Sequence, residues 1–199
     1  MKISRNILLA LFLLSFSKAT FASTDGLEPK QMVWPFDGAF GTFDRQAAQR
    51  GAQVYLEVCS ACHGLNHLYY RNLEDLGFSA AEVKEIAAKK NVTDGPNGEG
   101  EMFERPALPA DTIASPYPNE QAARAANNSA LPVDLSLIIK ARHDGANYVY
   151  SLLTGYKDAP ASVTLMPGLS YNPYFPGGQI AMPAPLSPNY DHALFSLIF

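Results

Sequence analysis

The chain has 199 residues and a formal net charge of −4, with 15 basic and 19 acidic side chains. This length is sufficient for one domain with a hydrophobic core of its own. The negative balance argues against nucleic-acid binding, because that class of function needs a basic surface. The chain has only two cysteines, so they can serve one site at most.

Residues 1–22 have the pattern of a secretory signal peptide. Basic residues near the start are followed by an apolar stretch, Ile7–Leu14, and by small residues up to Ala22. The apolar stretch is shorter than the roughly 18 residues that a membrane span requires. We therefore expect cleavage after Ala22 and export of the remaining domain, residues 23–199. A mitochondrial presequence would be richer in arginine, so the pattern favours a bacterial periplasm.

Removal of the signal segment takes away three basic residues, which leaves 12 basic and 19 acidic side chains and a net charge of −7. Such a surface favours rapid encounter with a basic protein partner, although charge of this kind also serves solubility alone. Acidic residues are concentrated between Asp94 and Glu104. We predict that this acidic segment guides the partner.

A helix is predicted from Asp44 to Val58. Asp44 is a suitable N-cap, and apolar or small residues then recur at helical spacing. Gly51 and Tyr55 lie one turn apart on one face of this helix. A small and an aromatic residue so placed form either a plain core face or a point where a second helix crosses closely, and the pattern leaves both open.

The helix leads directly into Cys59-Ser60-Ala61-Cys62-His63. C-x-x-C-H is the signature of covalent haem attachment, in which each cysteine sulfur adds to one vinyl group and the adjacent histidine coordinates the iron. A thioredoxin-like C-x-x-C does not need the histidine and usually follows a strand, and a structural zinc site would need two further ligands. We therefore predict one covalent haem c on Cys59 and Cys62, with His63 as the proximal ligand.

Beyond the motif, a second helix is predicted from Ser79 to about Lys90, opened by a capping box. Residues 91–118 are rich in glycine, proline and acidic residues, which predicts a long irregular loop. Asn119 can cap a short helix that continues through Ala126. Two further helices are predicted over residues 135–142 and 148–153, with a break between them.

From residue 158 to residue 188 the chain is rich in proline, glycine and aromatic residues and shows no helical period. Proline lacks an amide donor and clashes with the preceding turn, so this part is expected to form loops. The predicted fold class is therefore mostly α, a single-haem domain with long irregular loops.

The ligand opposite His63 decides what the iron can do. An open position would allow catalysis, whereas a methionine would give a high-potential electron carrier. Met166 and Met182 are the main candidates, because each precedes a proline that stiffens its loop. The segment around Met182 is the more constrained. The residues therefore favour Met182, with Met166 or simple packing as the alternatives.

Several runs of residues outside the haem motif carry a more specific signal. They include Trp34-Pro35-Phe36-Asp37-Gly38, Tyr117-Pro118-Asn119, Arg124-Ala125-Ala126-Asn127-Asn128, Tyr148-Val149-Tyr150-Ser151-Leu152-Leu153 and Asn172-Pro173-Tyr174-Phe175-Pro176-Gly177. Through these runs the chain resembles the cytochrome c1 family, the haem subunits of ubiquinol–cytochrome c reductase, over roughly residues 34–185. C-x-x-C-H is common to all c-type cytochromes, and the runs that begin at Arg124 and Asn172 make the match specific.

The resemblance implies a cytochrome c-like fold and places Met182 at the sixth-ligand position of the family. It also implies that Arg124 pairs with a haem propionate, with Asn127 and Asn128 along the same edge, and a surface arginine is the alternative. The family implies a carrier that accepts one electron from the Rieske iron–sulfur protein and donates it to a soluble cytochrome c. Cytochrome b would be its neighbour in the membrane-associated complex.

The end of the chain departs from the family pattern. Family members continue into a further helix and a transmembrane anchor, whereas this chain ends at Phe199. The apolar residues 193–199 are too few to span a bilayer. We therefore expect a C-terminally truncated form of a protein that belongs on the periplasmic side of the bacterial inner membrane, and release of this form because the anchor is missing.

Three functions are consistent with these features. The first is an electron-carrier subunit that is not catalytic alone, the second is a free soluble periplasmic shuttle, and the third is a haem enzyme with an open distal site. No Ser/His/Asp set, phosphate loop or carboxylate pair stands out as catalytic. Electron transfer needs only two axial bonds and a dry pocket, so we take the first function as the leading hypothesis.

Overall fold

The computed structural model describes residues 26–186 of the chain. The expected signal peptide, residues 1–22, and the apolar end, residues 193–199, lie outside the described residues. Within them the fold consists of helices, short strands and long loops, which confirms the mostly α expectation in outline. No helix within residues 26–186 is long and apolar enough to cross a membrane.

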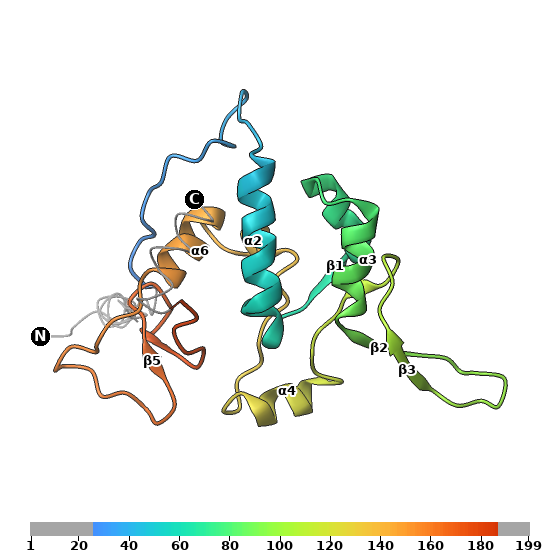
Figure 1. Cartoon of the computed structure of the whole chain (residues 1–199). Coiled ribbons are helices and arrows are strands. Elements are labelled where there is room, and N and C mark those ends of the chain that lie inside the picture. The colour runs from blue at the N-terminus through green and yellow to red at the C-terminus, as the bar shows by residue number, and fades with distance from the viewer. Residues whose placement is uncertain (1–25, 187–199) are drawn as a thin grey trace, which may run out of the picture.

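Helix α2 (Arg45–Glu57) stands between two groups of elements (Figure 1). Helix α3 (Ala80–Ala88) and the strands near it lie on one side, and helix α6 (Gly145–Leu153) lies on the other. The short helix α4 (Glu120–Ala126) lies near the C-terminal end of α2. Helix α2 is therefore flanked by elements from distant parts of the sequence, and its C-terminal end, where the cysteine motif begins, lies near α4.

Helix α2 forms as the sequence predicts. The side chain of Asp44 accepts hydrogen bonds from the backbone N–H groups of Gln46 and Ala47, which satisfies two of the free donors at the start of a helix. The helix ends at Glu57, and a short 3₁₀ turn, η1 (Cys59–Ala61), follows at once. The C-x-x-C segment thus follows a helix and not a strand.

The larger core cluster lies between α3 and the chain that follows the motif. Strand β1 (Leu65–Tyr69) runs into the 3₁₀ helix η2 (Tyr70–Leu76), and α3 packs against η2. The predicted capping box is present, since Ser79 accepts from the Glu82 backbone and the Glu82 carboxylate accepts from the Ser79 backbone. The buried members of this cluster are Tyr70, Leu73, Val83, Ala87, Ala107 and Ile113.

The prediction of a wholly irregular loop over residues 91–118 is wrong. Strands β2 (Asn91–Asp94) and β3 (Phe103–Pro106) form an antiparallel hairpin, and strand β4 (Thr112–Ile113) pairs with β1. The strands are short, and the glycines and prolines between them hide the alternation that a longer strand would show. The prediction of a loop was correct only for the tip of the hairpin and for the segments around β4.

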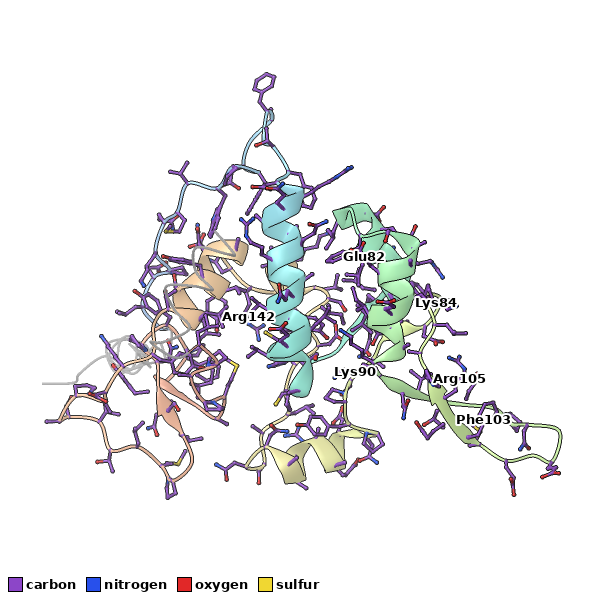
Figure 2. The ribbon with its side chains drawn as sticks, in the orientation of Figure 1. Glu82, Lys84, Lys90, Phe103, Arg105 and Arg142 are labelled. Carbon is purple, nitrogen blue, oxygen red and sulfur yellow. The ribbon has the colours of Figure 1, made fainter. Side chains whose placement is uncertain are left out.

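An ion-paired cluster holds the base of this hairpin. The Arg105 guanidinium bonds to the carboxylate of Asp94 on the paired strand and, at 2.6 Å, to that of Asp111. Figure 2 shows Arg105 and Phe103 on the hairpin, which projects away from α3. The Arg105 guanidinium lowers the pKa of both carboxyl groups, and both therefore stay ionised at neutral pH.

The second half of the chain follows the predicted order, with one helix shorter and one longer than predicted: α6 begins at Gly145 and not at residue 148. Asn119 caps α4 through its side chain, as predicted, but the helix expected over 135–142 is reduced to α5 (Ile138–Ala141). The predicted break before α6 is present, and Asp144 adopts a positive φ of 60° there. Up to Leu186, the last residue that the structure describes, the loop-rich end contains two two-residue strands, β5 (Ser170–Tyr171) and β6 (Gln179–Ile180).

The segment before α2 runs along α6 and then up to the start of α2 (Figure 1). Trp34 is only 8% exposed, and its indole Nε1 donates to the Asn147 side chain on α6 at 2.7 Å. Further back, the Lys30 ammonium donates to the Thr154 hydroxyl at 2.8 Å. These contacts attach the beginning of the described chain to the part that carries Met182.

Candidate functional site

Cys59, Cys62 and His63 lie on one tight turn at the end of α2. The Cys59 carbonyl oxygen accepts hydrogen bonds from the N–H of Cys62 at 3.0 Å and from the N–H of His63 at 2.9 Å. Both cysteines are free thiols. The turn therefore presents two sulfurs and one imidazole from five consecutive residues, with no crosslink between the sulfurs.

The His63 ring is oriented by a backbone carbonyl. Its Nδ1 atom lies 2.6 Å from the carbonyl oxygen of Val133. A carbonyl oxygen can only accept, so Nδ1 carries a proton, and in the neutral imidazole the lone pair is then on Nε2. This is the usual arrangement of a metal-ligating histidine, in which a second partner fixes the tautomer and the ring orientation.

Three further contacts fix the backbone around His63. The Tyr55 hydroxyl, on α2, donates to the His63 carbonyl at 2.9 Å, and burial raises the pKa of Tyr55 so that it remains a donor. The next carbonyl, that of Gly64, accepts from the N–H of Leu135 at 2.9 Å. The Asp134 carboxylate accepts from the N–H of Asn66 at 2.8 Å. Residues 133–135 thus run alongside the motif and hold its far end.

The chemistry of the thiols argues against a redox disulfide. Burial raises the pKa of the Cys59 thiol, whereas redox-active C-x-x-C cysteines have a lowered pKa. The Tyr117 hydroxyl lies 3.7 Å from the Cys62 sulfur and closes one side of the turn. Among residues 26–186, no three His, Cys, Asp or Glu side chains gather as a metal site, so nothing described there completes a zinc site. The residues present fit a haem held through two thioether bonds and one histidine.

Met182 lies just after β6 and is half-buried. Its carbonyl oxygen accepts a hydrogen bond from the Tyr156 hydroxyl at 3.1 Å. Four residues later, Leu186 packs against Val54 of α2, five residues before the first cysteine. The Met182 segment therefore runs from the end of α6 towards the helix that carries the motif.

Met166, the alternative ligand, is in a different setting. Its side chain is 60% exposed, and its backbone N–H donates to the Gln179 side chain at 2.9 Å. An axial thioether needs a site shielded from water, because water competes for the iron. The exposed position of Met166 supports Met182 as the better candidate.

Arg124 and Asn127 both lie at the C-terminal end of α4. The Arg124 guanidinium is exposed and donates to the Ser129 carbonyl at 3.2 Å, and the Asn127 amide donates to the Ala123 carbonyl at 2.7 Å. Asn128 donates to the Pro167 carbonyl at 3.3 Å and so connects α4 to the loop after Met166. Each residue thus has a local structural partner, and a propionate contact stays a prediction for Arg124 and Asn127.

Four residues that support the site were missed in the sequence. Tyr55 was noted only for its place on a helix face, and the other three, Tyr117, Val133 and Tyr156, were given no role. Each makes its contact with a residue distant in the sequence or through a backbone carbonyl, which leaves no local pattern. The only available signal was the position of Tyr117 inside one of the runs that carry the family resemblance.

Two hollows formed by residues of the described chain do not by themselves locate this site. One, of about 620 Å³, lies between α2 and α3, and the other, of about 680 Å³, is lined in part by Tyr156, Ala184 and Leu186. Neither is lined by the two cysteines or by His63. The chemistry of the turn is therefore the better guide to function, although the second hollow adjoins the Met182 segment.

Comparison with known proteins is decisive for the family. The model of the Cytochrome C1 family matches residues 34–192, which is most of the chain. The chain belongs to the cytochrome c1 family. This membership agrees with the motif, with the oriented histidine and with the runs noted in the sequence.

Individual relatives are about half identical to this chain. It is 52% identical over 179 residues to "Cytochrome c1 1, heme protein, mitochondrial" of Arabidopsis thaliana, covering 88% of this chain and 58% of that protein. It is 50% identical over 167 residues to the "Cytochrome c1, heme protein, mitochondrial" of Saccharomyces cerevisiae, covering 83% and 54%. A Candida albicans relative, "Cytochrome b-c1 complex catalytic subunit, mitochondrial", is 52% identical over 165 residues, covering 82% and 57%. The chain thus spans between half and three fifths of the length of these relatives.

Proposed function

We propose that this chain carries one covalent haem c and transfers single electrons as the haem subunit of a quinol-oxidising respiratory complex. The observation that carries the proposal is the turn at the end of α2. It presents two free thiols, and next to them a histidine whose Nδ1 is held by the Val133 carbonyl at 2.6 Å. The names of the relatives, which include "heme protein", support the same cofactor.

The roles of the residues follow from their chemistry. Cys59 and Cys62 would form the two thioether bonds with the haem. His63 would coordinate the iron through Nε2, and Met182 would supply the opposite ligand. A haem with histidine and methionine ligands supplies one-electron chemistry between ferrous and ferric iron. Rapid transfer requires that the ligands move little when the charge changes. The hydrogen bonds of Tyr55 and Val133 to His63 restrict the movement of this proximal ligand.

Arg124 and Asn127 would lie along the propionate edge of the cofactor. Arg124 is exposed and close to the end of α4, so its guanidinium can turn from the Ser129 carbonyl to a carboxylate without loss of a buried partner. We expect Arg124→Gln to lower the midpoint potential, because loss of a positive charge beside the haem stabilises the oxidised iron. An unchanged potential in this variant would remove Arg124 from the site.

The partners proposed are the Rieske iron–sulfur protein as donor, a soluble cytochrome c as acceptor and cytochrome b as neighbour. The Candida albicans relative is named as a subunit of the cytochrome b-c1 complex, which supports an assembly of this kind. We further propose the periplasmic side of a bacterial inner membrane, because residues 1–22 have the pattern of a bacterial export signal. The relatives compared are mitochondrial, so fractionation of the native cells tests the compartment directly.

The experiment that tests the proposal is expression of the chain in a host that attaches haem c. After acid–acetone extraction, which removes only non-covalent haem, the polypeptide should keep its haem spectrum. The double variant Cys59→Ala/Cys62→Ala should lose it, and Ala61→Ser, which leaves both thiols in place, should keep it. Extraction of the haem from the unaltered chain would contradict covalent attachment. Rapid binding of carbon monoxide to the reduced form would favour a haem enzyme with an open distal site instead.

A further inference from the structure

The C-terminal end of α6 is attached to the Met182 loop at two separate points. The carbonyl oxygen of Leu152, in the last turn of α6, accepts from the Asn172 side chain at 2.7 Å. Tyr156, three residues past the end of the helix, donates its hydroxyl to the Met182 carbonyl at 3.1 Å. One helix end therefore holds both the start and the finish of the segment that leads to the methionine.

Asn172 makes the first attachment rigid. It is completely buried, and its side-chain oxygen accepts from the N–H of Tyr174 at 3.1 Å while its own N–H donates to the Gly178 carbonyl at 2.9 Å. The turn it holds joins β5 to β6, whose pairing places Ser170 opposite Ile180. Met182 follows two residues after Ile180, so the path of the chain is defined up to the ligand itself.

Tyr156 makes the second attachment on the peptide group of Met182. Its ring is partly buried, and burial raises the pKa of Tyr156, so the hydroxyl keeps its proton at physiological pH. The methionine side chain has three rotatable bonds and therefore needs a fixed backbone if its sulfur is to stay in one place. Pro183 restricts the residue that precedes it, and the Tyr156 hydrogen bond fixes the carbonyl between the two.

From this geometry we infer that the end of α6, through Tyr156 and Asn172, positions Met182 and sets how firmly its sulfur stays on the iron. The inference rests on the proposed function, which makes Met182 the axial ligand. Tyr156 is a positioning residue, since its hydroxyl touches the methionine backbone and not the reacting atoms. Without this hydrogen bond the thioether would leave the iron more often, and a competing ligand would bind more readily.

The test uses the full chain with haem attached and compares Tyr156→Phe with Tyr171→Phe. Tyr171 lies on β5 of the same loop region, so its variant removes one hydroxyl from the same neighbourhood and serves as the control. The ferric protein is titrated with imidazole, and the methionine–iron absorption band is followed as pH rises. Loss of one partly buried hydrogen bond should raise the affinity for imidazole roughly 2- to 10-fold in Tyr156→Phe. The band should also disappear at lower pH in this variant, and Tyr171→Phe should match the unaltered chain.

The outcomes separate this inference from the proposed function. If Met182→Leu keeps the methionine–iron band, the assignment of the axial ligand fails and the inference fails with it. If Met182→Leu loses the band but Tyr156→Phe binds imidazole no better than the unaltered chain, only the positioning role is overturned. Should Tyr156→Phe not accumulate as folded protein, Asn172→Ser is titrated in its place. Tighter imidazole binding is expected there too, and an unchanged affinity overturns the inference.

Discussion

The hydroxyl of Tyr55 lies 2.9 Å from the carbonyl oxygen of His63, so helix α2 holds the last residue of the turn into which it leads. The two residues are eight positions apart in the sequence, and the chain between them carries both cysteines. On the other side of the same residue, the Val133 carbonyl holds the imidazole. The histidine is therefore fixed at its backbone by the helix and at its ring by a distant loop.

Replacement of Tyr55 by phenylalanine should lower the free energy of unfolding by about 0.5–1.5 kcal/mol, because the partly buried His63 carbonyl loses its donor. Chemical denaturation of the holoprotein measures this change. Tyr171→Phe is the control, since it removes one hydroxyl from β5, away from the haem turn. Equal stability of the two variants would show that the Tyr55 bond contributes nothing.

The elements that the sequence predicted correctly are those with local signals. The caps at Asp44, Ser79 and Asn119 all form as expected, because a capping side chain bonds to backbone only two or three residues away. The haem motif is also local, and its turn lies where the pattern places it. Local chemistry was therefore sufficient to find the helices and the centre of the site.

The features that the sequence did not predict depend on distant partners. Hairpin β2–β3 needs Asn91 to pair with Pro106, and the His63 ring needs a carbonyl 70 positions away. Neither contact depends on a particular residue type that could be recognised in the sequence, since backbone groups are present at every position. The helical spacing of Gly51 and Tyr55 likewise does not decide whether a second helix crosses closely at Gly51. Among the described residues, nothing lies within 4 Å of a Cβ built there.

Met182→Leu should abolish the methionine–iron absorption band and lower the midpoint potential, because the thioether stabilises ferrous iron. The decrease should be on the order of 0.1 V, within the roughly 0.8 V range that axial ligands span. Met166→Leu is the matched control, and its spectrum and potential should be unchanged because Met166 is exposed. Loss of the band in Met166→Leu alone would reverse the assignment.

The cluster of Arg105, Asp94 and Asp111 should make the fold sensitive to acid. Hydrogen bonds from Arg105 lower the pKa of Asp111 in the folded chain, so the stabilisation is complete above the ordinary aspartate value of about 3.9. It is lost as the pH falls through the lowered folded value. Asp111→Asn should reduce the melting temperature by roughly 2–4 °C at neutral pH, and the difference from the unaltered chain should shrink below about pH 4.

The control for this prediction is Glu85→Gln, which removes an exposed carboxylate from α3. It should melt like the unaltered chain at both pH values. A difference between Asp111→Asn and the unaltered chain that does not change with pH would mean that the ion pair is not the cause.

The structure divides the acidic segment Asp94–Glu104 into paired and exposed groups. Asp94 bonds to the Arg105 guanidinium, whereas Glu99, Glu101 and Glu104 are exposed. Glu104 accepts a hydrogen bond from the neutral Thr93 hydroxyl and keeps its charge. Only exposed charge attracts a distant partner effectively, because a paired carboxylate is neutralised by its neighbour.

The double variant Glu99→Gln/Glu101→Gln should therefore slow association with a basic cytochrome c at low salt by several-fold, and Asp94→Asn should have a much smaller effect. Stopped-flow measurement of electron transfer over a range of ionic strength would show this. A rate constant that does not depend on salt in the unaltered chain would rule out steering by this segment.

Two glycines near the motif should respond to alanine in opposite directions. Gly64 follows His63 directly and is buried, and a Cβ there would lie 2.7 Å from the backbone nitrogen of Ser115 and 3.0 Å from its Cα. Both atoms belong to the backbone, so the chain that leads from β4 to Tyr117 would have to move. Gly64→Ala should lower the free energy of unfolding by about 1–3 kcal/mol.

Gly51 lies inside α2 with open space around its Cβ direction, so Gly51→Ala should raise the free energy of unfolding by about 0.5–1 kcal/mol through helix propensity.

The pair also tests whether the Ser115 contact supports the haem turn itself. Movement of the Ser115 backbone would disturb Tyr117, whose hydroxyl lies 3.7 Å from the Cys62 sulfur. Gly64→Ala should therefore reduce the yield of protein with haem attached in the same expression host, while Gly51→Ala leaves the yield unchanged. Denaturant unfolding and the haem-to-protein absorbance ratio measure the two effects. A Gly64→Ala protein as stable and as fully loaded as the unaltered chain would show that the backbone at Ser115 yields easily and does not hold the turn.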